Sequence, residues 1–393
     1  MIDTDTLTTN DRTRSTSVTV GIVAWNEEKN IKSTLESLLE QTLFADLAAK
    51  NEVCQIVCVC NGCVDNTAAV ARAVLEMAAQ HHPFCSAISY KIVELEQAGK
   101  LNALNHLFQT AAPSEAEFLI VMDADITIHS PSSLASLCAA LQANSNAWFA
   151  IPRGIKRGQL DEQRNLQTNM SVQGSALHEV GTPENPNWVP GQMYCVRRSI
   201  AQAIYFPKEL LVEDMFLSTL AHSHFFSKPL DPPDKATIVK VDSATYIFEP
   251  YLRLPDILAN QKRQAMAHVL QELLINWIFS NLSESERGIA GLSSALKAKD
   301  AQEDRWLGQL LTAALREKKL FWQMLPNMYY TWPLRAVFEG AGRGGLALLP
   351  VALLRSGFHL LGLYMADSAF RDGQTYFWVD KSLAAHAASE SAS

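Results

Sequence analysis

The chain has 393 residues, of which 48% are hydrophobic and 19% are charged, and its formal net charge is −8. This balance is typical of a globular protein with a sizeable core, and the length predicts two or three domains. The acidic charge argues against a general nucleic-acid binder, so we expect no nucleic-acid partner.

The N-terminal half of the chain alternates predicted strands and helices. Residues 1–17 are polar, lack the apolar stretch of a secretory signal and are predicted to form a disordered tail. Apolar runs predict strands at 18–24, 53–60, 86–95, 117–122 and 147–152. The segments between them have the apolar spacing of helices. This alternation predicts an α/β fold, with a mostly parallel sheet that carries helices on both faces.

The segment 153–190 gives a poorer pattern. It is polar and rich in Gly, Asn and Gln, and it predicts a long loop that is either functional or disordered. A strand that leads into a helix is predicted at 192–200. The next apolar residues at helical spacing lie at 209–222, with Glu213 and Asp214 near the start of that helix.

From about residue 256 to 380 the pattern is helical, and a second polar tail is predicted at 381–393. The segment 344–366 is apolar and long enough to span a bilayer, but Arg355 and His359 lie within it. We therefore expect a buried or interfacial helix rather than a span, with peripheral contact to a membrane as one outcome. The nearby aromatic residues Trp322, Tyr329, Tyr330 and Trp332 are candidate interface anchors.

Polar residues follow several of the predicted strands. Because the carboxyl ends of parallel strands meet at one edge of a sheet, these residues are predicted to lie together where open α/β sheets bind ligands. They are Asn26, Glu27, Asp65, Lys100, Asp123 and Asp125.

The sequence Asp123-Ala124-Asp125 ends the strand predicted at 117–122. On an extended backbone these two carboxylates point to the same face, about 6.5 Å apart along the strand. Such oxygen ligands suit Mg²⁺ or Mn²⁺, which takes one or two carboxylates and completes its shell with water and phosphate oxygens. The pair therefore predicts a metal ion and a phosphorylated substrate, although Asp-x-Asp by itself is also common in solvated turns.

Five stretches in sequence order resemble an inverting glycosyltransferase of family 2, which has a nucleotide-sugar-binding GT-A fold. They are "VTVGIVAWNEEKNIKSTLESLLEQ", "VCVCNGCVDNTAAVA", "AGKLNALN", "VMDADI" and "LLVEDMFLSTLA". The resemblance covers residues 18 to 265 and implies a GT-A catalytic domain at 18–255, followed by the helical region.

The resemblance also implies roles for individual residues. The residues implied for nucleotide-sugar binding are Ala24, Asn26, Glu27, Asp65, Lys100 and Asp123. Asp125, with Asp123, is implied to hold Mg²⁺ or Mn²⁺ on the diphosphate. Asp214 is implied to be the general base. The residues implied for the acceptor or diphosphate side are Trp188, Gly191, Glu213 and Arg263.

Simpler interpretations stay open for single residues. A helix N-terminus also favours a residue such as Glu27, and Asp65 is also typical of a turn or a helix cap. Lys100 by itself is typical of a solvated lysine, and Glu213-Asp214 could be a solvated helix face. His222 and His224 could approach the diphosphate or lie elsewhere.

Processive family members carry Gln-x-x-Arg-Trp after the catalytic Asp, whereas this chain has the sequence Gln261-Lys262-Arg263-Gln264. We therefore expect a single-transfer enzyme.

These observations predict a metal-dependent inverting transfer of a sugar from a nucleotide-diphosphate sugar to a glycan or lipid-linked acceptor. Among the possible donors, a UDP-sugar is the first expectation. A nucleotidyltransferase-like enzyme and an inactive sugar-nucleotide-binding scaffold are the alternatives. Seven cysteines, an odd number, predict reduced thiols and hence a cytoplasmic protein, with the inner face of the plasma membrane as the expected site of any contact. The sequence does not indicate an oligomeric state.

Overall fold

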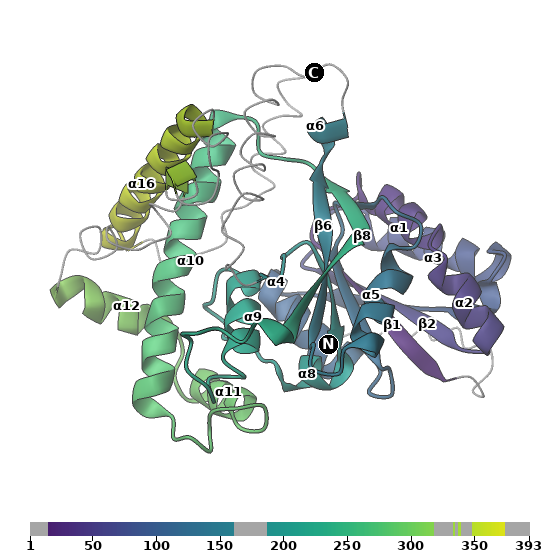
Figure 1. Cartoon of the computed structure of the whole chain (residues 1–393), viewed down its shortest axis with the longest axis horizontal. Helices are drawn as coiled ribbons and strands as arrows, with labels where there is room; N and C mark the ends of the chain where they lie inside the picture. Colours follow the sequence, from purple (N-terminus) through teal and green to yellow (C-terminus); the bar gives the residue numbers. More distant parts are fainter. Residues whose placement is uncertain (1–14, 161–186, 318–332, 335–336, 339–347, 374–393) are drawn as a thin grey trace.

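The computed structural model describes residues 15–160, 187–317, 333–334, 337–338 and 348–373. Its centre is one eight-stranded sheet with the order β3-β2-β1-β4-β7-β6-β8-β5 (Figure 1). The strands are β1 Thr16–Ala24, β2 Val53–Asn61, β3 Ile88–Leu95, β4 Phe118–Asp123, β5 Thr127–Ile128, β6 Phe149–Lys156, β7 Met193–Arg197 and β8 Ile238–Phe248.

The first four strands of that order, β3, β2, β1 and β4, are mutually parallel. β7 runs antiparallel to β4 and β6, and β5 runs antiparallel to β8, whereas β6 and β8 are parallel. The predicted α/β fold with a mostly parallel sheet is confirmed, with antiparallel strands at these places. In the register, Ala24 pairs with Cys60 and Val23 with Asp123, so the ends of β1, β2 and β4 lie level at one edge.

Helices cover both faces of the sheet. The bounds are α1 Ile31–Leu39, α2 Leu43–Lys50, α3 Thr67–His81, α4 Lys100–His106, α5 Ser133–Ala143, α6 Arg157–Leu160, α8 Arg198–Ala203, α9 Glu213–His222, α10 Leu254–Asn281, α11 Leu292–Gln302, α12 Trp306–Glu317 and α16 Leu349–Arg371. Residues of α1, α2, α3 and α5 form the core on one face. Residues of α4, α8 and α9 form the core on the other face, together with α10, α11, α12 and α16.

The structure corrects the predicted loop at 153–190 in its first part. Residues 153–156 continue β6, and Arg157–Leu160 form the short helix α6, while 161–186 lie outside the described residues. β6 pairs with β8, and the register of this pairing shifts between Pro152 and Arg153 of β6. Both strands have polar residues at this irregularity, and these hide the regular alternation that a sequence pattern needs.

The apolar segment predicted at 344–366 corresponds to α16, which begins at Leu349 and ends at Arg371. Pro350 therefore lies in the first turn, where proline costs no helical hydrogen bond, rather than inside the helix. Among the described residues, α16 is the one helix that is long and apolar enough to cross a membrane, and a third of its most apolar window is buried in the protein. Residues 1–14 and the tail at 381–393 lie outside the described residues, and Thr16 and Ser17 belong to β1.

Candidate active site

The loops that follow β1 and β2 are bound to each other. Asn26 adopts a left-handed backbone conformation with φ 54°, which asparagine tolerates better than most residues. The Glu27 N–H donates to the Thr67 hydroxyl at 2.8 Å, and the Glu28 N–H donates to the Asp65 carboxylate at 3.1 Å. Asp65 also accepts the Thr67 N–H at 3.1 Å, in the first turn of α3. Asp65 therefore caps a helix and holds the β1 loop at the same time.

Asn61 joins these loops to the start of α4. It is 2% exposed at the end of β2, and its amide donates to the Ala24 carbonyl at 2.8 Å. The Gly99 N–H donates to the Asn61 amide oxygen at 2.8 Å, which fixes the position of the neighbouring Lys100. Gly62 permits this arrangement because it has φ 64°, and a Cβ there would lie 2.7 Å from the Ala98 N atom. The sequence analysis missed Asn61, although an amide at the end of an apolar strand was a visible signal.

Lys100 is the centre of a charged cluster. Its ammonium group lies 2.7 Å from an Asp123 carboxylate oxygen and 2.6 Å from a Glu213 carboxylate oxygen. It also donates to the Gly191 carbonyl at 3.0 Å. The exposed fractions of the three charged side chains are 26% for Lys100, 17% for Asp123 and 7% for Glu213. Burial by itself lowers the pKa of Lys100, but Asp123 and then Glu213 outweigh it and raise that pKa. Lys100 is thus a fixed cation, not a solvated lysine.

Asp214 lies beside this cluster in the first turn of α9. Burial, and then the neighbouring Glu213 charge, raise the pKa of Asp214 to about 7. The Met215 N–H, which donates to Asp214 at 2.6 Å, and the charges of Lys100 and Arg263 limit that rise. A carboxylate whose pKa lies near neutrality is suited to accept a proton at physiological pH.

Gly191 and Gln192 contact the carboxylate residues of the site from two sides: Gly191 lies beside Glu213 and Asp214, and Gln192 binds Asp123. A Cβ on Gly191 would lie 2.8 Å from the Glu213 carboxylate, so only glycine fits beside it without displacing that side chain. The Gln192 carbonyl accepts the Asp123 N–H at 2.8 Å, and the Gln192 side chain accepts the Tyr246 hydroxyl at 3.2 Å. The sequence analysis missed Gln192 and Tyr246, because neither belongs to a motif.

Asp125 is exposed, and its side chain makes no hydrogen bond or ion pair with the described residues. Asp123 uses one carboxylate oxygen for Lys100. No group of three His, Cys, Asp or Glu side chains that could hold a metal occurs among the residues that the structure describes. Two carboxylates fit a magnesium-type ion that takes most of its ligands from phosphate and water, but they do not form a complete protein cage.

Comparison with known proteins adds to this geometry. Residues 19–201 match the family described as Glycosyl transferase family 2. The chain carries a glycosyltransferase family 2 domain. The match ends before Glu213 and Asp214, which follow it in the chain. No curated protein matches the sequence.

Two solved structures are among those similar to this chain. TarS residues 1–349 of S. aureus, in complex with UDP, has 16% identity and a TM-score of 0.41, with 92% of this chain and 93% of that chain covered. Glucosyl-3-phosphoglycerate synthase from Mycobacterium tuberculosis, in complex with Mn²⁺, UDP-glucose and phosphoglyceric acid, has 17% identity and a TM-score of 0.39, with 62% and 74% covered.

Helix α10 lies next to the candidate site. Arg263 lies near enough to Asp214 to lower its pKa, and its guanidinium donates to the Asn260 side chain at 3.0 Å. Gln271, further along α10, donates to Thr219 of α9 at 2.7 Å. The structure therefore brings Arg263 near Asp214, which lies beside Gly191 and Glu213.

Trp188 packs against a histidine at the C-terminal end of α9. Trp188 is 51% exposed and packs edge-on against His222, with ring centroids 5.6 Å apart. His222 ends α9, about 12 Å along the helix axis from Asp214 at 1.5 Å per residue. Trp188 therefore packs at the C-terminal end of α9, whereas Asp214 lies in the first turn of that helix.

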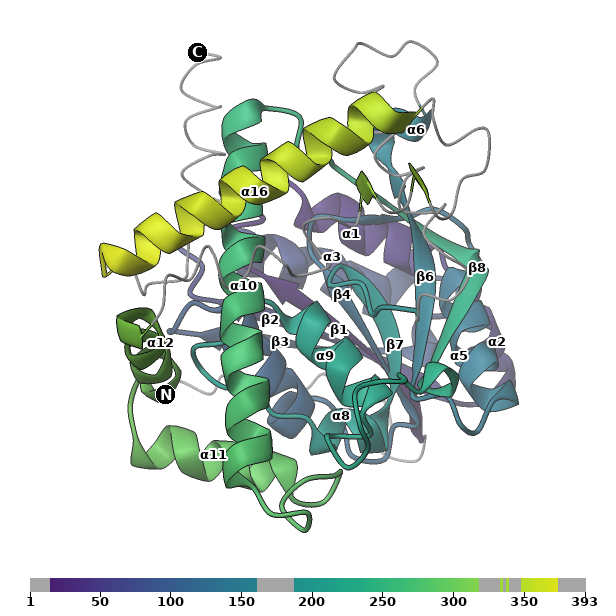
Figure 2. The same cartoon turned by 60° about the vertical axis from the view of Figure 1, so that its left-hand side comes forward.

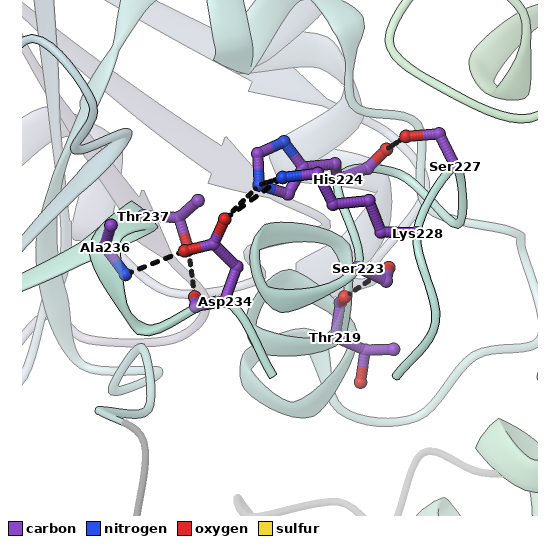
Figure 3. Close-up of polar contacts among 8 residues, drawn as sticks. All are labelled: Thr219, Ser223, His224, Ser227, Lys228, Asp234, Ala236 and Thr237. Atoms are coloured by element: carbon purple, nitrogen blue, oxygen red, sulfur yellow. Dashed lines mark hydrogen bonds and ion pairs between the residues drawn. The ribbon is translucent and has the colours of Figure 1, made fainter. Parts of the chain in front are cut away.

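His224 belongs to a cluster of its own in the loop after α9 (Figure 3). Its ring nitrogen lies 2.7 Å from the Asp234 carboxylate, which also pairs with Lys228 at 3.2 Å. The hydrogen bond from His224, followed by that from the Ala236 N–H, lowers the pKa of Asp234 to about 2. These contacts give His224 a structural role in holding the loop, and they direct its side chain to Asp234 instead of the Lys100 cluster.

Proposed function

We propose that this glycosyltransferase moves a sugar from a nucleotide-diphosphate sugar to an acceptor hydroxyl in one inverting step. The observation that carries the proposal is the meeting of Asp123, Lys100, Glu213 and Asp214 at one edge of the sheet. These residues come from the end of β4 and the first turns of α4 and α9. No packing requirement calls for four ionisable groups to meet there, whereas transfer from a diphosphate donor needs both charge stabilisation and a base.

Asp214 is the base in this proposal. Inversion requires one group on the face of the sugar opposite the leaving diphosphate to take the proton of the acceptor hydroxyl. The proton moves to the Asp214 carboxylate, the acceptor oxygen bonds to the anomeric carbon, and the bond to the diphosphate oxygen breaks with its electron pair. The raised pKa of Asp214, about 7, supports this role because the protonated form is then accessible near neutral pH.

Asp123 and Asp125 are the residues that would hold Mg²⁺ or Mn²⁺ in this proposal. Such an ion, when bound, neutralises charge on the leaving diphosphate. Lys100 keeps the Asp123 carboxylate in place through the 2.7 Å ion pair, and it adds a positive charge of its own at the same edge. Ala24, Asn26, Glu27 and Asp65 supply the nucleotide side, where the β1 and β2 loops are bound together.

The remaining expectations concern the substrates. The acceptor is proposed to be a glycan or a lipid-linked sugar of the cell envelope, and the enzyme to act in the cytoplasm or at the inner face of the plasma membrane. Arg263 faces the site without a following tryptophan, which supports a single transfer per binding event. A UDP-sugar is the first donor to test.

A donor screen and one variant test the proposal together. Thermal shift with a panel of nucleotide-diphosphate sugars, with and without Mn²⁺, is expected to identify the donor, because a ligand that binds only the folded state raises the melting temperature. Asp214→Asn is then expected to keep the donor shift while slowing transfer by roughly 10²–10⁴-fold. Asp304→Asn, an exposed aspartate between α11 and α12, is the matched control and should retain full activity.

Three results would contradict the proposal. Full activity of the Asp214→Asn variant would contradict the role of Asp214 as the base. Retention of the donor's anomeric configuration in the product, measured by NMR, would contradict the inverting mechanism. Release of pyrophosphate from a nucleoside triphosphate and a sugar phosphate would instead indicate a nucleotidyltransferase, although "AWNEEKN" after β1 lacks the Gly-rich phosphate loop of such enzymes.

A further inference from the structure

A row of buried polar side chains on α1 binds the backbone of the segment that follows β4. The helix covers the face of the sheet opposite to α9 and α10 (Figure 2). Thr34 and Ser37 of α1, and Gln41 just after it, are all buried and lie on one side of the helix at spacings of three and four residues. Buried polar groups need hydrogen-bond partners, and those of this row are backbone groups between residues 124 and 134.

Thr34 is the member of this row that lies beside Asp125. Its hydroxyl oxygen is 2.8 Å from the Ala124 carbonyl oxygen and 2.8 Å from the Ile126 carbonyl oxygen, with the Asn30 carbonyl further away at 3.3 Å. A hydroxyl has one hydrogen, so Thr34 donates it as a hydrogen bond shared between the two near carbonyls. These carbonyls belong to the residues on either side of Asp125. Thr34 therefore fixes the backbone both before and after this aspartate.

Ser37 extends the attachment by one more backbone group. Its hydroxyl donates to the Thr34 carbonyl at 2.8 Å and accepts the Ile128 N–H, in β5, at 3.0 Å. The segment 124–128 is thus bound to α1 through two carbonyls and one N–H. A turn held at these points has few other conformations to adopt.

The Asp125 carboxylate has no side-chain partner of its own in the described part of the chain. It is exposed and makes no hydrogen bond or ion pair with the residues described. The residues before and after it are buried in the same core as α1. Asp123 differs, because Lys100 holds its carboxylate at 2.7 Å. The place of the Asp125 carboxylate therefore depends on its backbone, and through the backbone on Thr34.

We propose that Thr34 is a positioning residue for the divalent cation, because its hydroxyl sets the backbone of Asp125 before the ion and the diphosphate bind. This inference rests on the proposed function, in which Asp123 and Asp125 hold Mg²⁺ or Mn²⁺. A ligand that is already in place loses little conformational freedom when the ion binds, so the ion is held more tightly. Groups that orient metal ligands in this way affect metal affinity without touching the ion.

Manganese binding tests the inference on the full chain. Mn²⁺ is titrated into the protein with and without UDP, and binding is followed by the enhancement of water proton relaxation, which reports an ion held on a slowly tumbling protein. Thr34→Val keeps the shape of the side chain but removes the hydrogen bond, so we expect it to weaken Mn²⁺ binding roughly tenfold. Thr34→Ser keeps the hydroxyl and should bind Mn²⁺ as wild type does. Thr34→Ala should show the same loss as Thr34→Val, so the test does not depend on how one variant folds.

Thr237→Val is the matched control. Thr237 is 1% exposed, as Thr34 is, and its hydroxyl also donates to a backbone carbonyl, that of Asp234, at 3.0 Å (Figure 3). It lies just before β8 and does not bind the segment 124–128. The control variant should therefore melt at a lower temperature than wild type, as Thr34→Val should, but bind Mn²⁺ normally. The comparison separates a loss of stability from a loss of the cation site.

Asp125→Asn separates this inference from the proposed function. We expect this variant to lose Mn²⁺ binding at least as strongly as Thr34→Val. If Asp125→Asn loses binding while Thr34→Val binds as wild type, Thr34 only satisfies two buried carbonyls, and the inference is wrong although the metal carboxylate stands. Equal weakening in Thr34→Ser and Thr34→Val would also contradict the inference, since the hydroxyl would not matter. Normal binding by Asp125→Asn, or no binding by wild type with or without UDP, would overturn the metal assignment and the inference together.

Discussion

At the scale of single residues, the ionisable groups of the site depend on one another. Asp214 is raised in pKa by burial and by Glu213, while Lys100 and Arg263 act in the opposite direction. Lys100 holds Glu213 at 2.6 Å and Asp123 at 2.7 Å, so it connects the neighbour of the proposed base to the proposed metal carboxylate. A change in any one of these charges should therefore appear in the pH dependence of the others.

The first prediction concerns the acid limb of the pH–rate profile. Wild-type kcat/KM should fall tenfold per pH unit below about pH 7, because Asp214 must be unprotonated to act as a base. Glu213→Gln removes a charge that raises the pKa of Asp214, so the limb should move to lower pH. Lys100→Met removes a charge that lowers it, so the limb should move to higher pH. Shifts of the same sign in both variants, measured under kcat/KM conditions, would show that another group limits the rate.

The second prediction concerns stability. The pKa of Asp214 is higher in the folded protein, about 7, than the usual 3.8. The folded state therefore holds this proton more tightly, and ionisation of Asp214 costs stability as the pH rises from about 4 through 7. Asp214→Asn should melt at a higher temperature than wild type at pH 8, and the gap should close as the pH approaches 4. A pH-independent gap in thermal melts would contradict the raised pKa.

At the scale of secondary-structure elements, two carboxylates attach the C-terminal helices to the catalytic fold. Asp300, at the end of α11, is 7% exposed and accepts hydrogen bonds from Trp306 at 2.6 Å, Tyr205 at 2.8 Å and the Lys208 N–H at 3.0 Å. Glu209 accepts the Gly308 N–H at 3.0 Å in the first turn of α12. An acceptor at this position satisfies a free N–H of the helix and suits its dipole.

The third prediction is that Asp300→Ala weakens this attachment. Its removal leaves the buried Trp306 donor and the half-buried Tyr205 donor without their acceptor, at a cost of roughly 1–3 kcal/mol each. The free energy of unfolding by urea should fall by about 2–6 kcal/mol on that basis. Asp304→Ala, an exposed residue of the following turn, is the control and should change it little. Equal stability of the two variants would mean that the Asp300 contacts contribute nothing.

At the scale of the whole molecule, the sheet and the C-terminal helices share one hydrophobic core. Leu119 and Val121 of β4, Phe216 of α9, Leu270 of α10 and Leu363 of α16 belong to the same cluster of buried residues. The predicted boundary at 255 therefore does not coincide with a break in the core, and it falls next to the start of α10 at Leu254. Elements that share a core are expected to unfold together.

The fourth prediction follows from this continuity. A fragment of residues 1–255 would expose the apolar surface that α10 covers, so it should aggregate or bind a hydrophobic dye and show no cooperative melt. A fragment of residues 1–317, which keeps α10, α11 and α12, should still melt cooperatively but at a lower temperature than the full chain. A cooperative, dye-free 1–255 fragment in calorimetry would show that the catalytic fold is independent.

The sequence by itself determined the α/β alternation, the edge of the sheet at which polar residues gather, and the motif residues from Asn26 to Asp214. In strands and amphipathic helices the apolar residues repeat every few positions, so neighbouring residues in the sequence are enough to predict these elements. Parallel strands end at a common edge, so the residues that follow them are expected to lie together. Only the tertiary structure decided that Lys100 pairs with both Asp123 and Glu213, and that Asn61, Gln192 and Tyr246 support the site. It also decided that Trp188 packs on the last residue of α9, and that α16 turns its leucines outward. These contacts join segments far apart in the chain, and their geometry depends on how whole elements pack, which no local pattern specifies.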